Sequence, residues 1–404
     1  MVGTMAKIDD SVKKKVPELR FPGFTDDWEE RKLGELTTSF SGGTPSAGNS
    51  SYYKGDIPFI RSGEINSDKT ELFLTEAGLK SSSAKMVSVG DILYALYGAT
   101  SGEVGISQIN GAINQAILAI KPCDGYNSHF LMQWLKLKKQ KIIDQYLQGG
   151  QGNLSGSIVK NLVLKVPNFE EQKKIGAFFK QLDDTITLHQ RKLDLLKEQK
   201  KGYLQKMFPK NGAKVPELRF AGFADDWEER KLGDLLKEFS IKSKIEDEHK
   251  VLSSTNSGME FREGRVSGTS NLGYKIIKNG DLVLSPQNLW LGNININNIG
   301  KGLVSPSYKT FEFINIDSSF INPQLRTQKM LEEYKNSSTQ GASVVRRNLE
   351  IDSFYQIKIF VPTISEQEKI GSFFKQLDDT IDLHQRKLDL LKEQKKGFLQ
   401  KMFV

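Results

Sequence analysis

The segment from Glu170 to Phe208 decides the architecture, because it occurs twice. It reads EEQKKIGAFFKQLDDTITLHQRKLDLLKEQKKGYLQKMF and returns as Ser365 to Phe403, with 34 of 39 positions identical. A shorter segment, Lys14 to Leu36, returns as Ala213 to Leu235 with 19 of 23 positions identical. The two offsets, 195 and 199 residues, are half the chain. Solenoid repeats recur every 20–50 residues or so, so the pattern indicates a tandem duplication of one large module.

The longer repeat predicts a helix with one apolar seam. Apolar residues recur every 3.5 positions on average and no proline interrupts either copy, which is typical of a coiled coil. Some 33 residues make a rod of roughly 50 Å. We expect the copies to pair antiparallel, since this gives a pseudo-two-fold axis. The seam comprises Ile175, Phe179, Leu182, Ile186, His189, Leu193 and Leu196, then Ile370, Phe374, Leu377, Ile381, His384, Leu388 and Leu391.

His189 and His384 occupy the same seam position. They are either a metal or pH-sensing pair, or polar seam residues that set the register as a buried Asn does. No carboxylate or cysteine is placed to complete a metal shell. We therefore favour the register role and expect no metal.

Composition limits the possible classes of protein. The 404 residues are 38% hydrophobic with a net charge of +8, which predicts two or three folded domains and permits an anionic partner. Cys123 is the only cysteine, so intrachain disulfides are excluded and a cytoplasmic location is expected. No apolar run approaches the roughly 20 residues of a membrane span, and Met1 to Lys15 has no signal-peptide core.

Between the repeats lie two regions that share almost no running identity, the first variable region (37–169) and the second variable region (236–364). They nevertheless share turns before strands, helix starts, and apolar strands that end at a proline. One fold with two different surfaces is the simplest interpretation. These paired signals are Gly90-Asp91 and Gly280-Asp281, Asn127-Ser128 and Asn322-Pro323, and Pro167 and Pro362.

The shorter repeat carries one tryptophan in each copy, Trp28 and Trp227. We interpret both as core anchors rather than ligand-stacking residues. The acidic residues around them suggest helix capping pairs, namely Asp26 with Glu29 and Asp225 with Glu228.

Catalytic motifs are missing from the sequence. It has no G-x-x-x-x-G-K-[ST] segment, no strand-linked G-x-G-x-x-G and no motif by which amino-methyltransferases bind the target amine. Glu171-Gln172-Lys173 resembles the end of a nuclease motif, but the second copy reads Glu366-Gln367-Glu368. Without a nucleophile and base the chain is predicted to bind rather than to catalyse.

Basic, amide and aromatic residues near predicted loops are candidate DNA contacts. Arg, Lys, Asn and Gln distinguish G from A in the major groove, and Lys and Arg neutralise phosphates. The candidates of the first variable region are Thr44, Lys54, Arg61, Lys85, Tyr97, Thr100, Asn114, Gln115, Gln151 and Asn153. Those of the second variable region are Arg262, Arg265, Gln287, Asn288, Trp290, Arg346 and Arg347.

These parts occur in a recognisable order. Each variable region is introduced by W-x-x-x-x-L-G-[ED]-L and followed by a helix that begins [ES]-E-Q-x-K-I. With YYKGDIPFI at 52–60 and VVRRNL at 344–349, the chain resembles the specificity subunit (HsdS) of type I restriction-modification systems from about Val16 to Val404.

The resemblance implies an α+β protein with two similar strand-rich target recognition domains separated by a long antiparallel two-helix coiled coil. Each domain would read one half of a bipartite, asymmetric site in double-stranded DNA, and the helices would set the spacing. The chain would lack catalytic residues and bind no cofactor. It would dock two modification subunits, which carry S-adenosylmethionine. Restriction subunits would supply ATP- and Mg²⁺-dependent translocation and cleavage. No membrane partner is implied.

The resemblance also suggests domain boundaries. Residues 1–15 would be an extension outside it, 16–169 the first target recognition domain and 170–210 the central helix. Residues 211–364 would be the second domain and 365–404 the C-terminal helix. Two other functions stay open from the residues alone: a two-headed protein scaffold without DNA, and a self-sufficient endonuclease.

Overall fold

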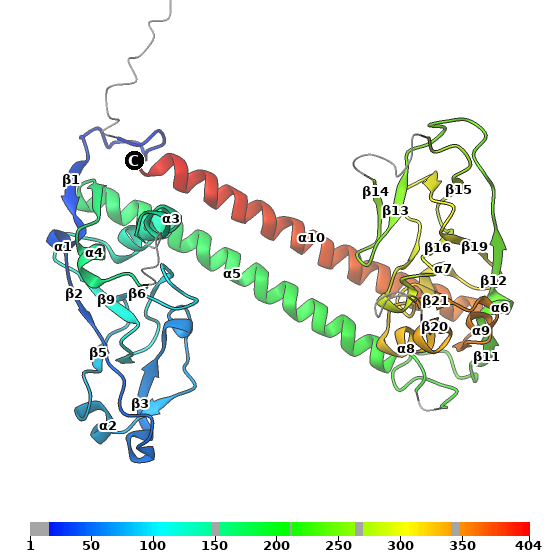
Figure 1. Cartoon of the computed structure of the whole chain (residues 1–404), viewed down its shortest axis with the longest axis horizontal. Coiled ribbons are helices and arrows are strands. Elements are labelled where there is room, and N and C mark those ends of the chain that lie inside the picture. The colour runs from blue at the N-terminus through cyan, green and yellow to red at the C-terminus, as the bar shows by residue number, and fades with distance from the viewer. Residues whose placement is uncertain (1–15, 147–152, 211, 263–269, 341–346) are drawn as a thin grey trace, which may run out of the picture. The chain divides into compact units, whose positions relative to one another are not determined.

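The chain divides into two compact units. The computed structural model describes residues 16–146, 153–210, 212–262, 270–340 and 347–404. The first unit contains residues up to 190 together with 387–404, and the second unit contains residues 191–386. The division falls within two long helices, α5 (Phe169–Lys206) and α10 (Ile364–Met402) (Figure 1). Each unit therefore holds one variable region and parts of both helices.

The predicted seam positions of α5 and α10 are withdrawn from solvent. Ile175, Phe179, Leu193 and Leu196 are buried, as are the equivalent residues of α10. The remaining seam positions, including His189 and His384, are half-buried. This is the burial that a coiled-coil seam requires. Among the described residues, no helix combines the length and the apolar character needed to cross a bilayer.

The two helices pair antiparallel in each unit. In the first unit the Nζ atom of Lys395 on α10 lies 2.5 Å from a carboxylate oxygen of Asp183 on α5. In the second unit Lys200 on α5 makes the equivalent contact with Asp378 on α10, also at 2.5 Å. The same ion pair therefore forms twice, with the donor and acceptor helices exchanged, as a duplicated antiparallel pair requires.

A buried ion pair ties the shorter repeat to the start of each long helix. Arg20 donates from Nε and Nη2 to the two carboxylate oxygens of Glu171 at 2.7 and 2.8 Å. Arg219 binds Glu366 in the same bidentate way, at 2.7 Å for both bonds. Both glutamate side chains are fully buried. Such paired, planar bonds are among the strongest in proteins.

The glutamine after each of these glutamates ties the helix to its variable region. The carbonyl oxygen of the Gln172 side chain accepts from the backbone N–H of Asn127, and its amide donates to the Pro167 carbonyl. Gln367 makes the same two bonds, with Asp317 and Pro362. The repeated Glu-Gln dipeptide thus joins each long helix to its variable region. This structural role accounts for the Glu171-Gln172 part of the segment that resembles a nuclease motif.

The end of each long helix completes an aromatic cluster in the unit that it reaches. In the first unit, Phe403 at the end of α10 packs against Trp28, Phe130 and Phe179, with ring centroids 5.1 to 6.4 Å apart. In the second unit, Phe208 after α5 packs against the equivalent residues, Trp227, Phe320 and Phe374. Trp28 and Trp227 are buried, as expected of core anchors.

The first variable region is built on two four-stranded sheets, ordered β2-β9-β6-β7 and β4-β3-β8-β5, while β1 pairs with β10. Its helices are α1 (Leu33–Leu36), α2 (Glu76–Lys80), α3 (Ser128–Tyr146) and α4 (Gly156–Lys160). Its strands are β1 (Glu29–Lys32), β2 (Thr37–Ser41), β3 (Tyr53–Ile60), β4 (Phe73–Leu74), β5 (Lys85–Val87), β6 (Ile92–Ala95), β7 (Val104–Ile106), β8 (Gly111–Ile113), β9 (Ile117–Pro122) and β10 (Val163–Val166).

The second variable region repeats the frame, with a sheet ordered β12-β19-β16-β17 and the pair β11-β22. Three further pairs are β13-β14, β15-β18 and β20-β21. Its strands are β11 (Glu228–Lys231), β12 (Leu236–Phe239), β13 (Leu252–Ser254), β14 (Met259–Phe261), β15 (Lys275–Ile277), β16 (Leu282–Leu284), β17 (Ile294–Ile296), β18 (Gly302–Val304), β19 (Lys309–Phe313), β20 (Ser338–Gln340), β21 (Arg347–Leu349) and β22 (Lys358–Val361). Its helices are α6 (Leu232–Leu235), α7 (Ser318–Ile321), α8 (Gln328–Asn336) and α9 (Ile351–Tyr355).

Most of the paired turn signals behave as predicted. Gly90 and Gly280 have φ of +98° and +88° and stand two residues before β6 and β16. Asn127 begins α3, because its side-chain oxygen accepts from the backbone N–H of Phe130. Pro167 and Pro362 follow directly on β10 and β22.

Two local predictions are wrong. Asn322-Pro323 does not start a helix: Asp317 caps α7 five residues earlier, and Asn322 lies at its C-terminal end. Asp26 with Glu29 is not a capping pair, since Glu29 opens β1 and pairs with Val166 across the strands. Glu228 likewise opens β11. Tertiary strand pairing overrides a short local signal in these cases.

Loss of the Arg20–Glu171 pair tests the junction. Arg20→Ala leaves the Glu171 carboxylate buried without its partner, so we expect the free energy of unfolding to fall by about 3–5 kcal/mol. Arg219→Ala should have the same effect. Urea denaturation at neutral pH measures both. The control is Arg31→Ala, which removes an exposed ion pair with Glu29 and should change stability far less, because solvent screens an exposed pair. Equal losses of stability for Arg20→Ala and Arg31→Ala would contradict the stabilising role of the buried Arg20–Glu171 pair.

Candidate nucleic-acid interface

Four of the predicted DNA contacts meet at one edge of a sheet. Strands β3 and β8 run parallel, with Ile60 opposite Ile113, so the residues that follow them emerge at the same edge. Arg61 follows β3, and Asn114 and Gln115 follow β8. The backbone N–H of Asn114 donates to the Ile60 carbonyl at 3.2 Å. Residues distant in the sequence are thus neighbours for a geometric reason.

Thr44 joins this edge because two glycines allow a close approach. The backbone N–H of Gly43 donates to the Ile113 carbonyl at 3.1 Å. A Cβ atom on Gly42 would lie 2.0 Å from the same carbonyl oxygen, so no other residue fits there without displacement. The Thr44 hydroxyl then donates to the side-chain oxygen of Gln115.

Together these residues line an open cavity of about 490 Å³, the readout cavity. Polar groups and apolar surface are both available in it, which suits the edge and the methyl group of a base. Lys85 lies beside it, since it pairs with Ile113 across β5 and β8, and its Nζ atom lies 5.4 Å from the Phe40 ring centroid. The lining residues are Thr44, Ala47, Tyr53, Phe59, Arg61, Leu72, Asn114 and Gln115.

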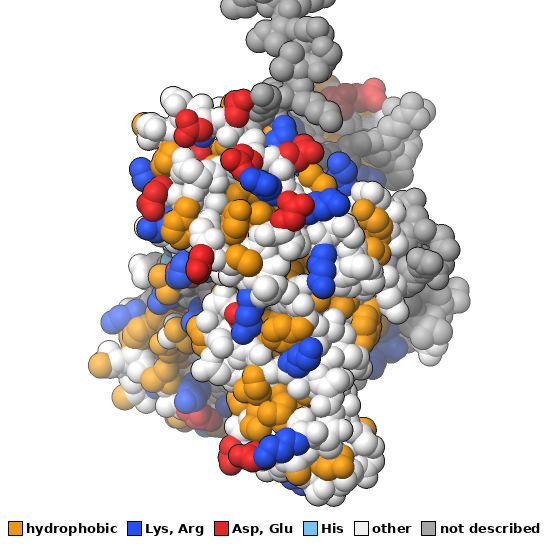
Figure 2. Space-filling view, turned by 90° about the vertical axis from the view of Figure 1, so that its left-hand side faces the viewer, with side chains coloured by type: hydrophobic (Ala, Val, Ile, Leu, Met, Phe, Trp, Pro, Cys, Tyr) orange, Lys and Arg blue, Asp and Glu red, His pale blue; other side chains and the backbone are white. Residues whose placement is uncertain are grey.

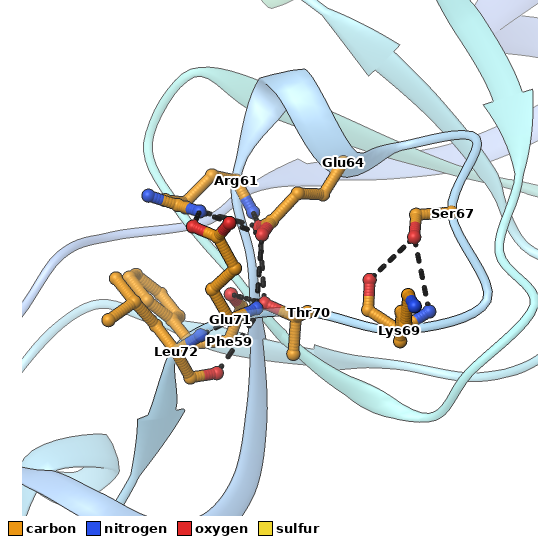
Figure 3. A network of polar contacts seen from close by, with 8 residues as sticks. All are labelled: Phe59, Arg61, Glu64, Ser67, Lys69, Thr70, Glu71 and Leu72. Atoms are coloured by element: carbon orange, nitrogen blue, oxygen red, sulfur yellow. Dashed lines mark hydrogen bonds and ion pairs between the residues drawn. The ribbon is translucent and has the colours of Figure 1, made fainter. Parts of the chain in front are cut away.

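The guanidinium of Arg61 is held by two carboxylates (Figure 3). Its Nε donates to Glu64 at 3.2 Å, and its Nη2 donates to Glu64 at 2.8 Å and to Glu71 at 2.7 Å. These bonds use the Nε hydrogen and both Nη2 hydrogens, so only Nη1 still has free donors. A bidentate contact to guanine needs two adjacent donor nitrogens. The geometry therefore makes Arg61 an organiser of the cavity wall rather than a guanine reader.

Glu64 stays ionised in this network. Burial raises the pKa of Glu64, but hydrogen bonds from the Arg61 side chain and from the backbone of Arg61 and Glu71 outweigh it and bring the pKa down to about 2. The Thr70 hydroxyl adds a further bond at 3.1 Å. Sequence reasoning missed Glu64 and Glu71, although the Arg-x-x-Glu spacing from Arg61 was a usable signal.

Other candidates of the first variable region lie apart from the readout cavity. Tyr97 pairs with Asn153 through an isolated antiparallel bridge, so these two candidates do meet. Thr100 is half-buried in the turn after Tyr97, and its carbonyl accepts from the N–H of Glu103. Lys54 is exposed on β3 with φ of +64°. Gln151 lies outside the described residues.

In the second variable region, Gln287 and Arg347 come together. The backbone N–H of Arg347 lies 3.4 Å from the Gln287 carbonyl. The Arg347 side chain donates from Nε and Nη2 to the hydroxyl and carbonyl of Ser338 and to the Lys335 carbonyl. Like Arg61, Arg347 uses the Nε and Nη2 edge of its guanidinium for hydrogen bonds within the protein. Gln287 itself is exposed and free to project outward.

The remaining candidates of this region are more scattered. Asn288 precedes the short turn Leu289–Leu291, Trp290 lies at its centre, and both are half-buried. Trp290 packs against the core of the second unit, so it is chiefly a core residue. Arg262 is exposed just after β14. Arg265 and Arg346 lie outside the described residues.

Charge is distributed unevenly over the first unit. Figure 2 shows acidic and basic side chains mixed in the upper part of one face, while its lower part carries fewer, separated charged side chains of both signs among apolar surface. In Figure 1 the lower part of this unit is the end that holds β3, β5 and α2. The end with the readout cavity therefore carries charges of both signs, with Glu64 and Glu71 beside Arg61 and Glu76 beside Lys80.

Comparison with known proteins identifies the frame. A family model described as "Type I restriction modification DNA specificity domain" matches residues 25–198 and again 224–393. These two matches cover most of the chain and reproduce its duplication. The chain belongs to this family.

Relatives of similar length support the assignment. A putative type I restriction enzyme specificity subunit, MjaX, from Methanocaldococcus jannaschii is 24% identical, covering 93% of this chain and 92% of the relative. The MjaVIII specificity subunit of the same organism is 21% identical, covering 96% and 93%. The crystal structure of a type I S subunit from M. genitalium shares the fold, with a TM-score of 0.66 at 17% identity, covering 96% of this chain and 99% of that one. Type I specificity proteins are non-catalytic recognition subunits, and this chain is one of them.

The Arg61 network of this specificity protein predicts a pH-dependent loss of stability. The folded pKa of Glu64 is about 2, below its ordinary value of 4.5, so its contribution is complete above pH 4.5 and is lost as the pH falls toward 2. Glu64→Gln should lower the free energy of unfolding at pH 7 by about 1.5–3 kcal/mol, and the difference from wild type should shrink at pH 3.

Urea denaturation at the two pH values checks this expectation. Glu76→Gln is the matched control, because Glu76 forms an exposed pair with Lys80 and should change little. A Glu64→Gln difference that stays constant from pH 7 to pH 3 would show that the carboxylate contributes nothing specific.

Proposed function

We propose that this specificity subunit reads a bipartite, asymmetric site in double-stranded DNA, one half with each variable region. The observation that carries the proposal is the duplicated frame with two different polar surfaces. The ion pairs, aromatic clusters and sheet order recur in both units, whereas the residues at the candidate interfaces do not. A repeated frame with different surfaces suits a protein that reads two different half-sites in one molecule. We propose residues 16–169 and 211–364 as the two target recognition domains.

The readout cavity is the best-supported contact in the first half-site. Gln115 is exposed and Asn114 half-exposed at its rim, and an amide of Asn or Gln bonds bidentately to adenine. Lys85 supplies a positive charge for a nearby phosphate. We assign base recognition to Asn114 and Gln115, with Arg61 holding the wall. In the second variable region Gln287 has the equivalent role.

The long helices are proposed to set the spacing and to dock the partners. A helix of 38 residues is about 57 Å long, which exceeds the roughly 34 Å of one DNA turn between half-sites. Each helix also exposes two leucines seven residues apart, outside its seam, at 52–67% exposure in α5 and 48–62% in α10. These are Leu188 and Leu195 in α5, and Leu383 and Leu390 in α10.

Nearly identical apolar stripes suit two copies of one partner. We infer that the partners are modification subunits, which would carry S-adenosylmethionine. Restriction subunits would join the complex and contribute ATP- and Mg²⁺-dependent chemistry. The scaffold alternative has no support once the family is known. The endonuclease alternative loses its candidate motif, because Glu171 is buried against Arg20.

Exchange of the first variable region tests independent readout. Replacing residues 37–169 by the corresponding region of another specificity subunit should change one half-site and leave the other half unaltered, because the frame contacts are shared. Mapping methylated adenines in a host that carries the complex gives both halves of the motif. The control is the reciprocal exchange of residues 236–364. A change in both halves after a single exchange would refute the assignment.

An insertion in α5 tests the spacing role. Four residues added between Leu182 and Ile186 lengthen the helix by about 6 Å and rotate the seam by about 40° beyond a full turn. We expect an altered spacer or the loss of specific binding, as measured by competition with duplexes of different spacer length. Four residues inserted between Pro306 and Ser307, in an exposed loop, serve as the control. An unchanged spacer preference would show that the long helices do not set the spacing between the half-sites.

A further inference from the structure

A second cavity lies in the second unit, away from the candidate interface. It has a volume of about 650 Å³ and lies between the end of α5, the start of α8 and strand β22. Its apolar floor includes Leu204, Phe208, Met330 and Phe360. Six lysines and Arg326 are also among the lining residues, together with Gln, Thr, Pro and Ile side chains, and none of the described lining residues is acidic. We call it the lysine-rimmed cavity.

A difference between the two variable regions creates this cavity. Phe130 and Phe320 are equivalent, since each packs edge-on against its tryptophan at 5.8 and 5.6 Å. Four residues further on, the first variable region has Trp134, which is 4% exposed within the continuous helix α3. The second variable region has Gln324 there, after Pro323 has separated α7 from α8. In the second unit the smaller Gln324 side chain and the break between α7 and α8 leave a space open. In the first unit Trp134 fills the equivalent space.

Several spare polar groups of the lysine-rimmed cavity are donors. The side-chain nitrogen Nε2 of Gln324 is buried without a hydrogen-bond partner among the described residues. Arg326 bonds only to the backbone carbonyls of Ile294 and Thr255, so no carboxylate neutralises it within the described chain. Lys197 and Lys329 have no ion-pair partner there either. An anion with an apolar body satisfies these donors and this floor together.

The position of the cavity indicates where such a ligand comes from. Lys197, Lys201 and Leu204 belong to α5, the helix whose exposed leucines are proposed to dock a partner. The site thus lies on the same helix as that docking surface, roughly half a turn round the helix from Leu195. Among the described residues no glycine-rich loop lines it, so they offer no backbone cradle of the kind by which proteins usually hold the phosphates of a nucleotide.

We propose that the lysine-rimmed cavity binds an acidic peptide segment with an apolar anchor residue, supplied by a modification subunit docked on α5. The inference rests on the proposed docking function. The anchor enters over Phe208 and Met330, and its flanking carboxylates meet Lys197, Lys329 and the Gln324 amide. Trp134 fills the equivalent place in the first unit, so one of the two partner copies makes this contact and the other does not. The two copies should therefore bind with unequal affinity.

Three variants of the full chain test the proposal, each titrated with the modification subunit by analytical ultracentrifugation. Gln324→Trp fills the cavity with the residue that the first variable region carries. The double variant Lys197→Glu, Lys329→Glu reverses the rim charge without filling the space. Lys392→Glu is the matched control, since Lys392 is the equivalent of Lys197 in α10 and faces no such cavity in the proposal.

We expect wild type to bind two copies with different affinities. Gln324→Trp and the double variant should each weaken the tighter copy tenfold or more, as loss of an anchor contact does, and Lys392→Glu should not. Specific DNA binding by the isolated chain should stay within about twofold. If wild type bound no modification subunit at all, the proposed docking function would fail. If it bound two copies and both cavity variants behaved like wild type, the cavity proposal alone would be overturned.

Two further measurements test whether the cavity binds DNA phosphates instead of a peptide and whether it is accessible. If the double variant weakened duplex binding and flattened its salt dependence while assembly was unchanged, the cavity would be a phosphate-binding surface for DNA, and the peptide would be excluded. Direct binding of 8-anilinonaphthalene-1-sulfonate, an anion with an aromatic body, checks that the space is accessible in the full chain. Its fluorescence should fall in Gln324→Trp and persist in Gln324→Ala; an equal signal in both would overturn the site.

Discussion

The antiparallel pairing of α5 and α10 is the constraint on which the rest of the molecule depends. Neither unit has a complete core without residues from the end of a distant helix. Phe403 closes the aromatic cluster around Trp28, and Phe208 closes the one around Trp227. Phe403 stands more than two hundred residues from most of the first unit. The cores and the helix pair must therefore form together, and this coupling explains why the helices tolerate so few differences between copies.

The buried Arg–Glu and Gln contacts convert this pairing into a defined junction. Burial of the Glu171 and Glu366 carboxylates costs free energy, and the bidentate bonds from Arg20 and Arg219 offset that cost. The side-chain oxygens of Gln172 and Gln367 then accept from the backbone N–H of Asn127, which caps α3, and of Asp317, which caps α7. A rigid junction of this kind lets the variable regions change their surfaces while their attachment to the helices is preserved. Recognition can thus diverge on a constant frame.

The sequence predicted more of the frame than of the interface, for a physical reason. Helix period, duplication and glycine turns are local patterns, and they correctly indicated α5, α10 and the strands after Gly90 and Gly280. The interface depends on which segments meet. Thr44, Arg61, Asn114 and Gln115 were named from residue type alone, and only the parallel pairing of β3 with β8 brought them together. Residue type also could not tell that Arg61 would be bound by Glu71, ten residues away, or that Trp290 would pack into the core.

By itself, the sequence determined that the protein is a duplicated module on a paired-helix frame, because repeats and heptads survive as linear patterns. The tertiary structure alone decided which donors stay free. Arg61 and Arg347 look like base-reading residues in the sequence, yet each spends its Nε and Nη2 donors on neighbours that lie 3 to 12 residues away. Gln324 looks like an ordinary helix residue, yet its amide lies buried beside an open cavity. Hydrogen-bonding capacity is finite, and its allocation depends on neighbours in space that the linear order does not reveal.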